Sequence, residues 1–226
     1  MLRPIPGLKK GEFVQKIMQV ETSSLDALTF DGNDLWISDV VEKTIKKVSI
    51  SEQQVLKEIK FLPGGVPRAM TFANDSLVVA NYDSSLEVST ELIQINVMNG
   101  KTLRTLTCPE EIDSGIIFDN TYFWGSSAKT QALYKFHPST GEIEQEIPME
   151  AAVCGLAWNG EHLIVGLDKG KDHAFTSIII LDINSQKILG EQEVDARIGG
   201  LAFADNMIFY TSTENKEIQV TRIKIS

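Results

Sequence analysis

The chain has few of the residues that most often carry chemistry, with two cysteines and three histidines among its 226 residues. Cys108 and Cys154 form no disulfide framework and no Cys-x-x-Cys pair, so we expect two free thiols. The histidines, His137, His162 and His173, are too scattered to indicate a Ser-His-Asp or Cys-His set. No glycine-rich phosphate loop is present either. The sequence therefore predicts no metal and no cofactor.

Long apolar runs are also missing. No run approaches the ~20 residues of a membrane span, and residues 1–13 lack an apolar stretch of signal-peptide length. The formal net charge of −10 disfavours nucleic acids and anionic membranes as partners. We therefore expect a soluble, cytoplasmic monomer that binds neither. An exported form from which a signal peptide has been removed remains an alternative.

No linker and no long amphipathic helix interrupt the chain, and 42% of its residues are hydrophobic, which is enough for a core. What the chain does contain is a repeat. Each copy is marked by an aromatic residue that follows a stretch of small and apolar residues. The intervals between these aromatic residues are 42, 46, 40 and 45. The aromatic residues are Phe30, Phe72, Phe118, Trp158 and Phe203. Since the spacing covers the whole chain, we expect one repetitive domain, residues 1–226.

Several columns of the repeat align without gaps. Every copy has a large apolar residue five positions after the aromatic residue and a small one eight positions after it. Every copy also has a small residue three positions before the aromatic residue: Ala27, Ala69, Gly115, Gly155 and Gly200. A polar turn follows each aromatic residue, and the next run is almost wholly apolar, which is typical of a strand buried on both faces. Each copy therefore predicts four antiparallel strands.

The fifth copy reaches the end of the chain after its third strand, and residues 12–20 can supply the missing fourth strand. Joining both ends in one sheet closes a ring and removes open sheet edges. We therefore predict an all-β, five-bladed β-propeller with four-stranded antiparallel blades. The blades are expected near residues 25–59, 67–106, 113–147, 153–194 and 198–225 plus 12–20. A six-bladed ring with one degenerate blade is the alternative.

Residues 135–142, Lys-Phe-His-Pro-Ser-Thr-Gly-Glu, resemble the hairpin between the third and fourth strands of PQQ-like and YVTN-like propeller repeats. This resemblance implies a fold and no particular function. The predicted ring is also similar to the glutaminyl cyclotransferases of plants and bacteria, which are five-bladed propellers. That family has Phe-Thr-Gln-Gly-Leu entering the first blade and Phe-Gly-Glu-Gly entering the second, and its Glu is thought to shuttle protons.

Neither motif of the cyclotransferases is present in this chain. Residues 24–28 read Ser-Leu-Asp-Ala-Leu, and residues 66–70 read Val-Pro-Arg-Ala-Met. Arg68 stands where the resemblance would place the acid/base Glu, and a guanidinium does not release its proton in proteins. We therefore expect the fold of that family without its activity.

Two further columns predict a candidate site at one end of the central tunnel, where first strands begin and second strands end. The entry column contains Asp26, Arg68, Ser114, Cys154 and Gly199. The exit column contains Asp39, Asn81, Ser127, Leu167 and Ser212, and Asp113 and Asp168 lie one position from these columns. This ring of polar residues could hold a small polar ligand or a cation. In the alternative interpretation Arg68 pairs with Asp26 or Asp113, and water fills the rest.

Two long loops between second and third strands, residues 81–87 and 167–173, are also candidates for binding, because loops on a rigid scaffold often carry function. The first adds Tyr82, and the second offers Asp168, Asp172 and His173. Two lysines in the second loop oppose a cation, and its spacing fits no known metal loop, so we interpret it as a solvated loop.

We therefore interpret the chain as a binding or interaction module for an unknown small polar ligand or protein. The alternative is an enzyme that acts on a small polar substrate through the residues at the tunnel mouth. Its candidate residues would be Asp26, Asp39, Arg68, Asp113 and Cys154. Cys154 near Arg68 could be an activated thiol, but its flanking residues are those of a packed strand.

Overall fold

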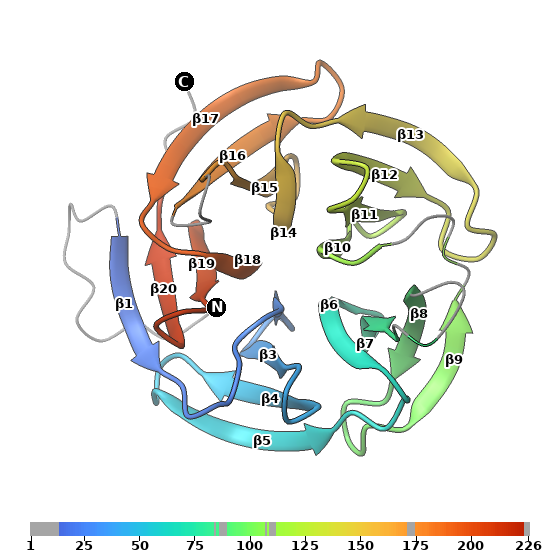
Figure 1. Ribbon diagram of the computed structural model, residues 1–226, viewed down its shortest axis with the longest axis vertical. Helices are drawn as coiled ribbons and strands as arrows, with labels where there is room; N and C mark the ends of the chain where they lie inside the picture. The colour runs from blue at the N-terminus through green and yellow to red at the C-terminus, as the bar shows by residue number, and fades with distance from the viewer. Residues whose placement is uncertain are drawn as a thin grey trace.

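The computed structural model describes residues 14–83, 85, 90–106, 108, 112–170 and 175–223. These residues form twenty strands in five antiparallel sheets of four strands, arranged as a ring around a central axis (Figure 1). The predicted five-bladed β-propeller is therefore confirmed. Within the described part of the chain, no helix has the length and apolar composition that a membrane span requires.

Each blade runs from an inner strand at the tunnel to an outer strand at the perimeter. Blade 1 consists of β2 (Leu28–Phe30), β3 (Leu35–Asp39), β4 (Thr44–Ser49) and β5 (Gln54–Lys60). Blade 2 consists of β6 (Val66–Ala73), β7 (Ser76–Tyr82), β8 (Thr90–Ile95) and β9 (Thr102–Leu106). Blade 3 consists of β10 (Gly115–Phe118), β11 (Phe123–Ser127), β12 (Ala132–Phe136) and β13 (Ile143–Pro148). Blade 4 consists of β14 (Ala152–Trp158), β15 (Leu163–Asp168), β16 (Thr176–Asp182) and β17 (Lys187–Val194).

Blade 5 joins the two ends of the chain, as predicted. It contains β18 (Ile198–Ala204), β19 (Met207–Ser212) and β20 (Glu217–Thr221), and its outer strand is β1 (Val14–Gln19). β1 pairs antiparallel with β20, from Val14 opposite Thr221 to Gln19 opposite Glu217. The ring is thus closed by hydrogen bonds between strands that are distant in the sequence.

The hydrophobic core lies between the blades, because each second strand is apolar on both faces. In β7, Leu77 and Val79 pack with residues of blade 1, whereas Val78 and Ala80 pack with residues of blade 3. The alternation of side chains across a strand therefore gives each blade two apolar faces, one for each neighbour.

The small column of the repeat lies where the inner strands approach each other around the tunnel. A Cβ atom on Gly200 would lie 2.3 Å from the backbone nitrogen of Leu28 in the next blade, and one on Gly115 would lie 2.9 Å from Cγ of Leu156. The tunnel has a cavity volume of only about 10 Å³ for a water-sized sphere, roughly the room that one water needs. At this level the tunnel therefore has room for about one water molecule.

Candidate functional site

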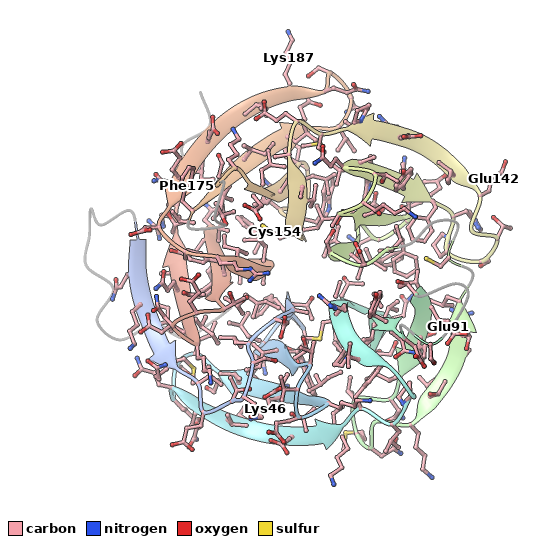
Figure 2. All side chains as sticks on the ribbon, in the orientation of Figure 1. Lys46, Glu91, Glu142, Cys154, Phe175 and Lys187 are labelled. Atoms are coloured by element: carbon pink, nitrogen blue, oxygen red, sulfur yellow. The ribbon has the colours of Figure 1, made fainter. Side chains whose placement is uncertain are left out.

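One end of the ring, which we call the mouth, is formed where the first strands begin, the second strands end and the third strands begin. The entry residues Asp26, Arg68, Ser114, Cys154 and Gly199 all lie at the start of the inner strands or just before it. Figure 2 shows Cys154 on the innermost strand of blade 4, close to the centre of the ring. The exit candidates lie at the ends of the second strands, further from the axis: Asp39, Asn81, Tyr82, Ser127, Asp168 and Ser212.

The carboxylate of Asp39 is already used within the protein. The residue is 1% exposed, and six hydrogen bonds reach its two oxygens. The donors are the hydroxyls of Thr22 and Ser24 and the backbone N–H groups of Ser23, Ser24, Val41 and Glu42. Burial disfavours the charged form, but hydrogen bonds led by those from Glu42 and Thr22 outweigh it and lower the pKa of Asp39 to about 2. Asp39 thus anchors the segment that leads from β1 into blade 1.

Asp26 has the opposite electrostatic situation. Its Oδ2 atom is buried and has no hydrogen-bond partner in the described structure. Burial raises the pKa of Asp26 and the charge of Asp39 adds to this, although a hydrogen bond from Ser24 and the charge of Arg68 act against it. Its backbone carbonyl accepts a hydrogen bond from Thr211 Oγ1 at 2.8 Å, which fixes Asp26 at the contact between blades 5 and 1.

Arg68 supplies a positive charge at the mouth. Its side chain is exposed, and its guanidinium carbon lies 5.1 Å from the centre of the Tyr82 ring, in the range of a cation–π contact. Among the described residues, no carboxylate lies within ion-pair distance of Arg68, so the alternative of a pair with Asp26 or Asp113 is not what the structure contains. Arg68 acts on Asp26 through its electric field alone.

Blade 3 contributes polar groups that mostly bind each other. The hydroxyl oxygens of Ser114 and Ser126 are 3.0 Å apart, and the Asp113 carboxylate accepts a hydrogen bond from the backbone N–H of Ala128 at 2.9 Å. Ser127 is 1% exposed, and its hydroxyl has no partner in the described structure. Asp113 and Ser114 therefore hold the loops of this blade in place.

Buried oxygens that have no partner within the described residues lie at the mouth end of blades 1, 2, 3 and 5. They include Asp26 Oδ2, Thr44 Oγ1, Asn81 Oδ1, Thr90 Oγ1, Ser127 Oγ and Ser212 Oγ. Leaving such a group unbonded costs about 1–3 kcal/mol, so in folded proteins these groups bind water or a ligand. The exit column predicted Asn81, Ser127 and Ser212, whereas Thr44 and Thr90 at the starts of the third strands were missed. Aligning the first residue of each third strand could have found them.

Asp168 ends β15 in blade 4, and its negative charge acts on the Cys154 thiol. Asp172 and His173 of the second long loop lie outside the described residues, as do residues 84, 86 and 87 of the first. Among the described residues, no group of three or more potential metal ligands converges at the mouth or elsewhere.

Neither Cys108 nor Cys154 forms a disulfide, as predicted. Cys154 reaches solvent in part, but burial of the thiol, together with the nearby charge of Asp168, raises its pKa to about 12. The positive charge that opposes this shift comes from Arg197 and not, as the sequence suggested, from Arg68. A thiol with such a pKa is almost fully protonated at neutral pH and is a poor nucleophile.

We predict slow alkylation of Cys154. In a Cys108→Ser background at pH 8, iodoacetamide should label Cys154 on the order of 10³-fold more slowly in the native protein than in the urea-unfolded chain, because its thiolate fraction is that much smaller. Mass spectrometry of timed samples gives both rates. A native rate within tenfold of the unfolded one would contradict the assignment of a buried, protonated thiol.

The closed ring, its narrow tunnel and the polar mouth define the chain as a five-bladed β-propeller. No family model matches the sequence, and a search of the curated proteins finds no match. A crystal structure of Myxococcus xanthus glutaminyl cyclase is similar over 94% of this chain and 97% of that one, with a TM-score of 0.73 and 13% identity. A protein of unknown function from Bacteroides caccae is similar over 85% of this chain and 72% of its own, with a TM-score of 0.51 and 12% identity.

At such low identities these comparisons show a shared fold alone. The expected similarity in fold to the glutaminyl cyclotransferases is confirmed. Membership of the PQQ-like or YVTN-like repeat families is not confirmed, because no family model matches.

Proposed function

We propose that this propeller binds a small anionic or zwitterionic molecule at the mouth, and that Arg68 is the group that holds its negative charge. The observation that carries the proposal is an exposed guanidinium with no ion-pair partner among the described residues. A guanidinium stays charged at all physiological pH values and offers five N–H donors in a planar fork that suits carboxylate and phosphate. Its contact with the Tyr82 ring limits the orientations that it can adopt.

Asp26 would contact the same ligand as a hydrogen-bond acceptor, whereas Arg68 would contact it as a donor. Its buried Oδ2 lacks a partner in the described structure, so a ligand N–H or O–H group that reaches it would remove an unmet hydrogen bond. The tunnel below is too narrow for more than a water, so the ligand would lie across the mouth. A molecule that carries a carboxylate and an amino or hydroxyl group suits both Arg68 and Asp26.

Binding is favoured over glutaminyl cyclisation, although the similar Myxococcus xanthus protein is a glutaminyl cyclase. Arg68 occupies the position at which that family carries its acid/base Glu, and a guanidinium cannot exchange a proton with a substrate at neutral pH. Asp39 cannot take over this role, because its six hydrogen bonds hold it ionised in a structural contact. An enzyme that acts on a small polar substrate at the mouth is the second candidate function.

The proposal predicts a ligand-dependent rise in melting temperature that requires Arg68. A panel of small carboxylates, phosphates and amino acids is tested against the wild-type chain, and the best compound is titrated by calorimetry. A ligand at 100 times its Kd stabilises the folded state by about 2.7 kcal/mol, which a thermal scan detects. Arg68→Ala should abolish the shift and weaken binding at least tenfold.

The matched control is Arg104→Ala, which removes an exposed arginine from the perimeter of blade 2 and should keep the full shift. If no anionic or zwitterionic compound shifts the wild-type protein, or if the shift persists in Arg68→Ala, the proposed site is wrong.

A further inference from the structure

The outer strands of the blades run along the perimeter of the ring one after another, as Figure 1 shows for β5, β9, β13, β17 and β1. Each is the last strand of its sheet and pairs with a neighbour on one side only. Unpaired backbone groups on such an edge can form a ladder with another extended chain, and proteins usually guard their edges with charges or proline. The outer strands can therefore be compared for the charged residues and prolines that protect their edges.

β9 has few of these protective features. Four of its five residues are exposed, and the side chain of Leu103 has an exposed fraction of 54%. Residues 95–106 contain neither a carboxylate nor a proline. By contrast, β13 presents the exposed Glu144 and Glu146 and ends at Pro148. Among the described residues, no backbone hydrogen bond leads from β9 to anything beyond β8.

The hairpin end of β9 is basic, although the whole chain has a net charge of −10 and the exposed Glu91 of β8 lies near the other end of the strand. Lys101 and Arg104 are exposed on the hairpin and on the strand itself. The end of β5 adds Lys57 and Lys60 next to the same hairpin, since Lys57 Nζ donates to the carbonyl of Met98 at 2.9 Å and a Cβ on Gly100 would lie 2.7 Å from the carbonyl oxygen of Lys60. The one carboxylate of β5, Glu58, lies 3.5 Å from Lys46.

We propose that β9 is a docking edge for an extended acidic segment of a partner protein, which would add a fifth strand to blade 2. The free edge would supply backbone hydrogen bonds, Leu103 would supply an apolar contact, and the four basic side chains would select carboxylates on the incoming strand. A basic or neutral segment gains nothing from these charges. This surface is on the perimeter, so it is independent of the ligand proposed for the mouth.

The test uses fluorescein-labelled eight-residue peptides and anisotropy at low salt. The probe alternates valine and glutamate, and the comparison peptide alternates valine and lysine. The wild-type chain should bind the acidic peptide at least tenfold more tightly than the basic one. The Lys101→Glu/Arg104→Glu double variant should lose this binding. The Lys129→Glu/Lys187→Glu variant changes the net charge equally at exposed positions on other blades, and it should bind as the wild type does. Figure 2 shows Lys187 projecting from the top of the ring, away from β9 at the lower right of Figure 1.

A second readout locates the peptide. Amide hydrogen exchange should slow in β9 on peptide binding and stay unchanged in β13. Equal binding of both peptides, equal loss in the control variant, or protection that appears elsewhere would each overturn the proposal. The proposal would also be overturned if a single-stranded oligonucleotide bound more tightly than the acidic peptide and depended in the same way on Lys101 and Arg104. The basic side chains would then bind phosphate groups, and no added strand would be needed.

Discussion

Replacing Gly200 by alanine should destabilise the folded protein by about 3 kcal/mol or more, a large part of the 5–15 kcal/mol that a domain typically has. The new Cβ atom would lie 2.3 Å from the nitrogen of Leu28 and 2.8 Å from the carbonyl carbon of Ala27. Both are backbone atoms of the neighbouring blade, so no change of side-chain rotamer can relieve the clash. The inner strands of blades 5 and 1 would have to separate, and this contact belongs to the closure of the ring.

Urea unfolding followed by fluorescence measures the effect. The control is Gly64→Ala, because a Cβ at Gly64 would meet only the flexible end of Asp83 at 3.6 Å. That variant should stay within about 0.5 kcal/mol of the wild type. If Gly200→Ala unfolds at the wild-type urea concentration, the inner strands are not packed as tightly as described.

The fold could be predicted because its repeat places equivalent residues in equivalent environments. Gly115, Gly155 and Gly200 share one column because in blades 3, 4 and 5 a Cβ would meet atoms of the next blade, and blades 1 and 2 carry the small Ala27 and Ala69 there. The aromatic residues at or next to the ends of the first strands and the apolar second strands follow from packing between blades, which is similar in all five. Because the packing environment repeats, the sequence pattern repeats as well. Both the number of blades and the closing strand could be deduced from this pattern.

The site could be predicted only in outline, because its contacts come from segments that do not repeat. Asp39 is in the expected column, but its oxygens are occupied by residues 22–24, whose conformation no column of the repeat reports. The β-bulge at Arg68 recurs in blades 4 and 5, but the stacking of Arg68 on Tyr82 joins two side chains that no other blade carries at these positions. The sequence thus indicated which end of the tunnel is polar. It did not indicate which charged side chains at that end are already held by contacts within the protein.

Asp39 gives the second large effect, because it holds the segment through which the closing strand β1 enters blade 1. Asp39→Ala would leave the donors of Thr22, Ser23, Ser24, Val41 and Glu42 without their acceptor. We expect a loss of about 3 kcal/mol or more in the free energy of unfolding. Hydrogen exchange should speed up in β1 more than in β13, since the anchored segment directly follows β1. A uniform acceleration in all blades would contradict a local role in closure.

The charge of Asp39 should make part of this stability depend on pH. Its pKa is about 2 in the folded state against an ordinary value of 3.8, so the folded state binds the proton less tightly than the unfolded chain does. A carboxyl with a depressed pKa contributes stability above its unfolded pKa and loses it as the pH falls toward the folded one. Asp39→Asn keeps the size of the side chain but removes its charge and turns one acceptor oxygen into an NH2 donor. It should therefore lack the charge-dependent contribution, about 2 kcal/mol at neutral pH, in addition to a loss of hydrogen bonds that does not vary with pH. The difference in unfolding free energy between wild type and Asp39→Asn should therefore shrink as the pH falls from 5 to 2, whereas Asp195→Asn, at an exposed position, should track the wild type throughout. A difference that stays constant over this range would mean that Asp39 stabilises the closing segment through its acceptor oxygens and not through its charge.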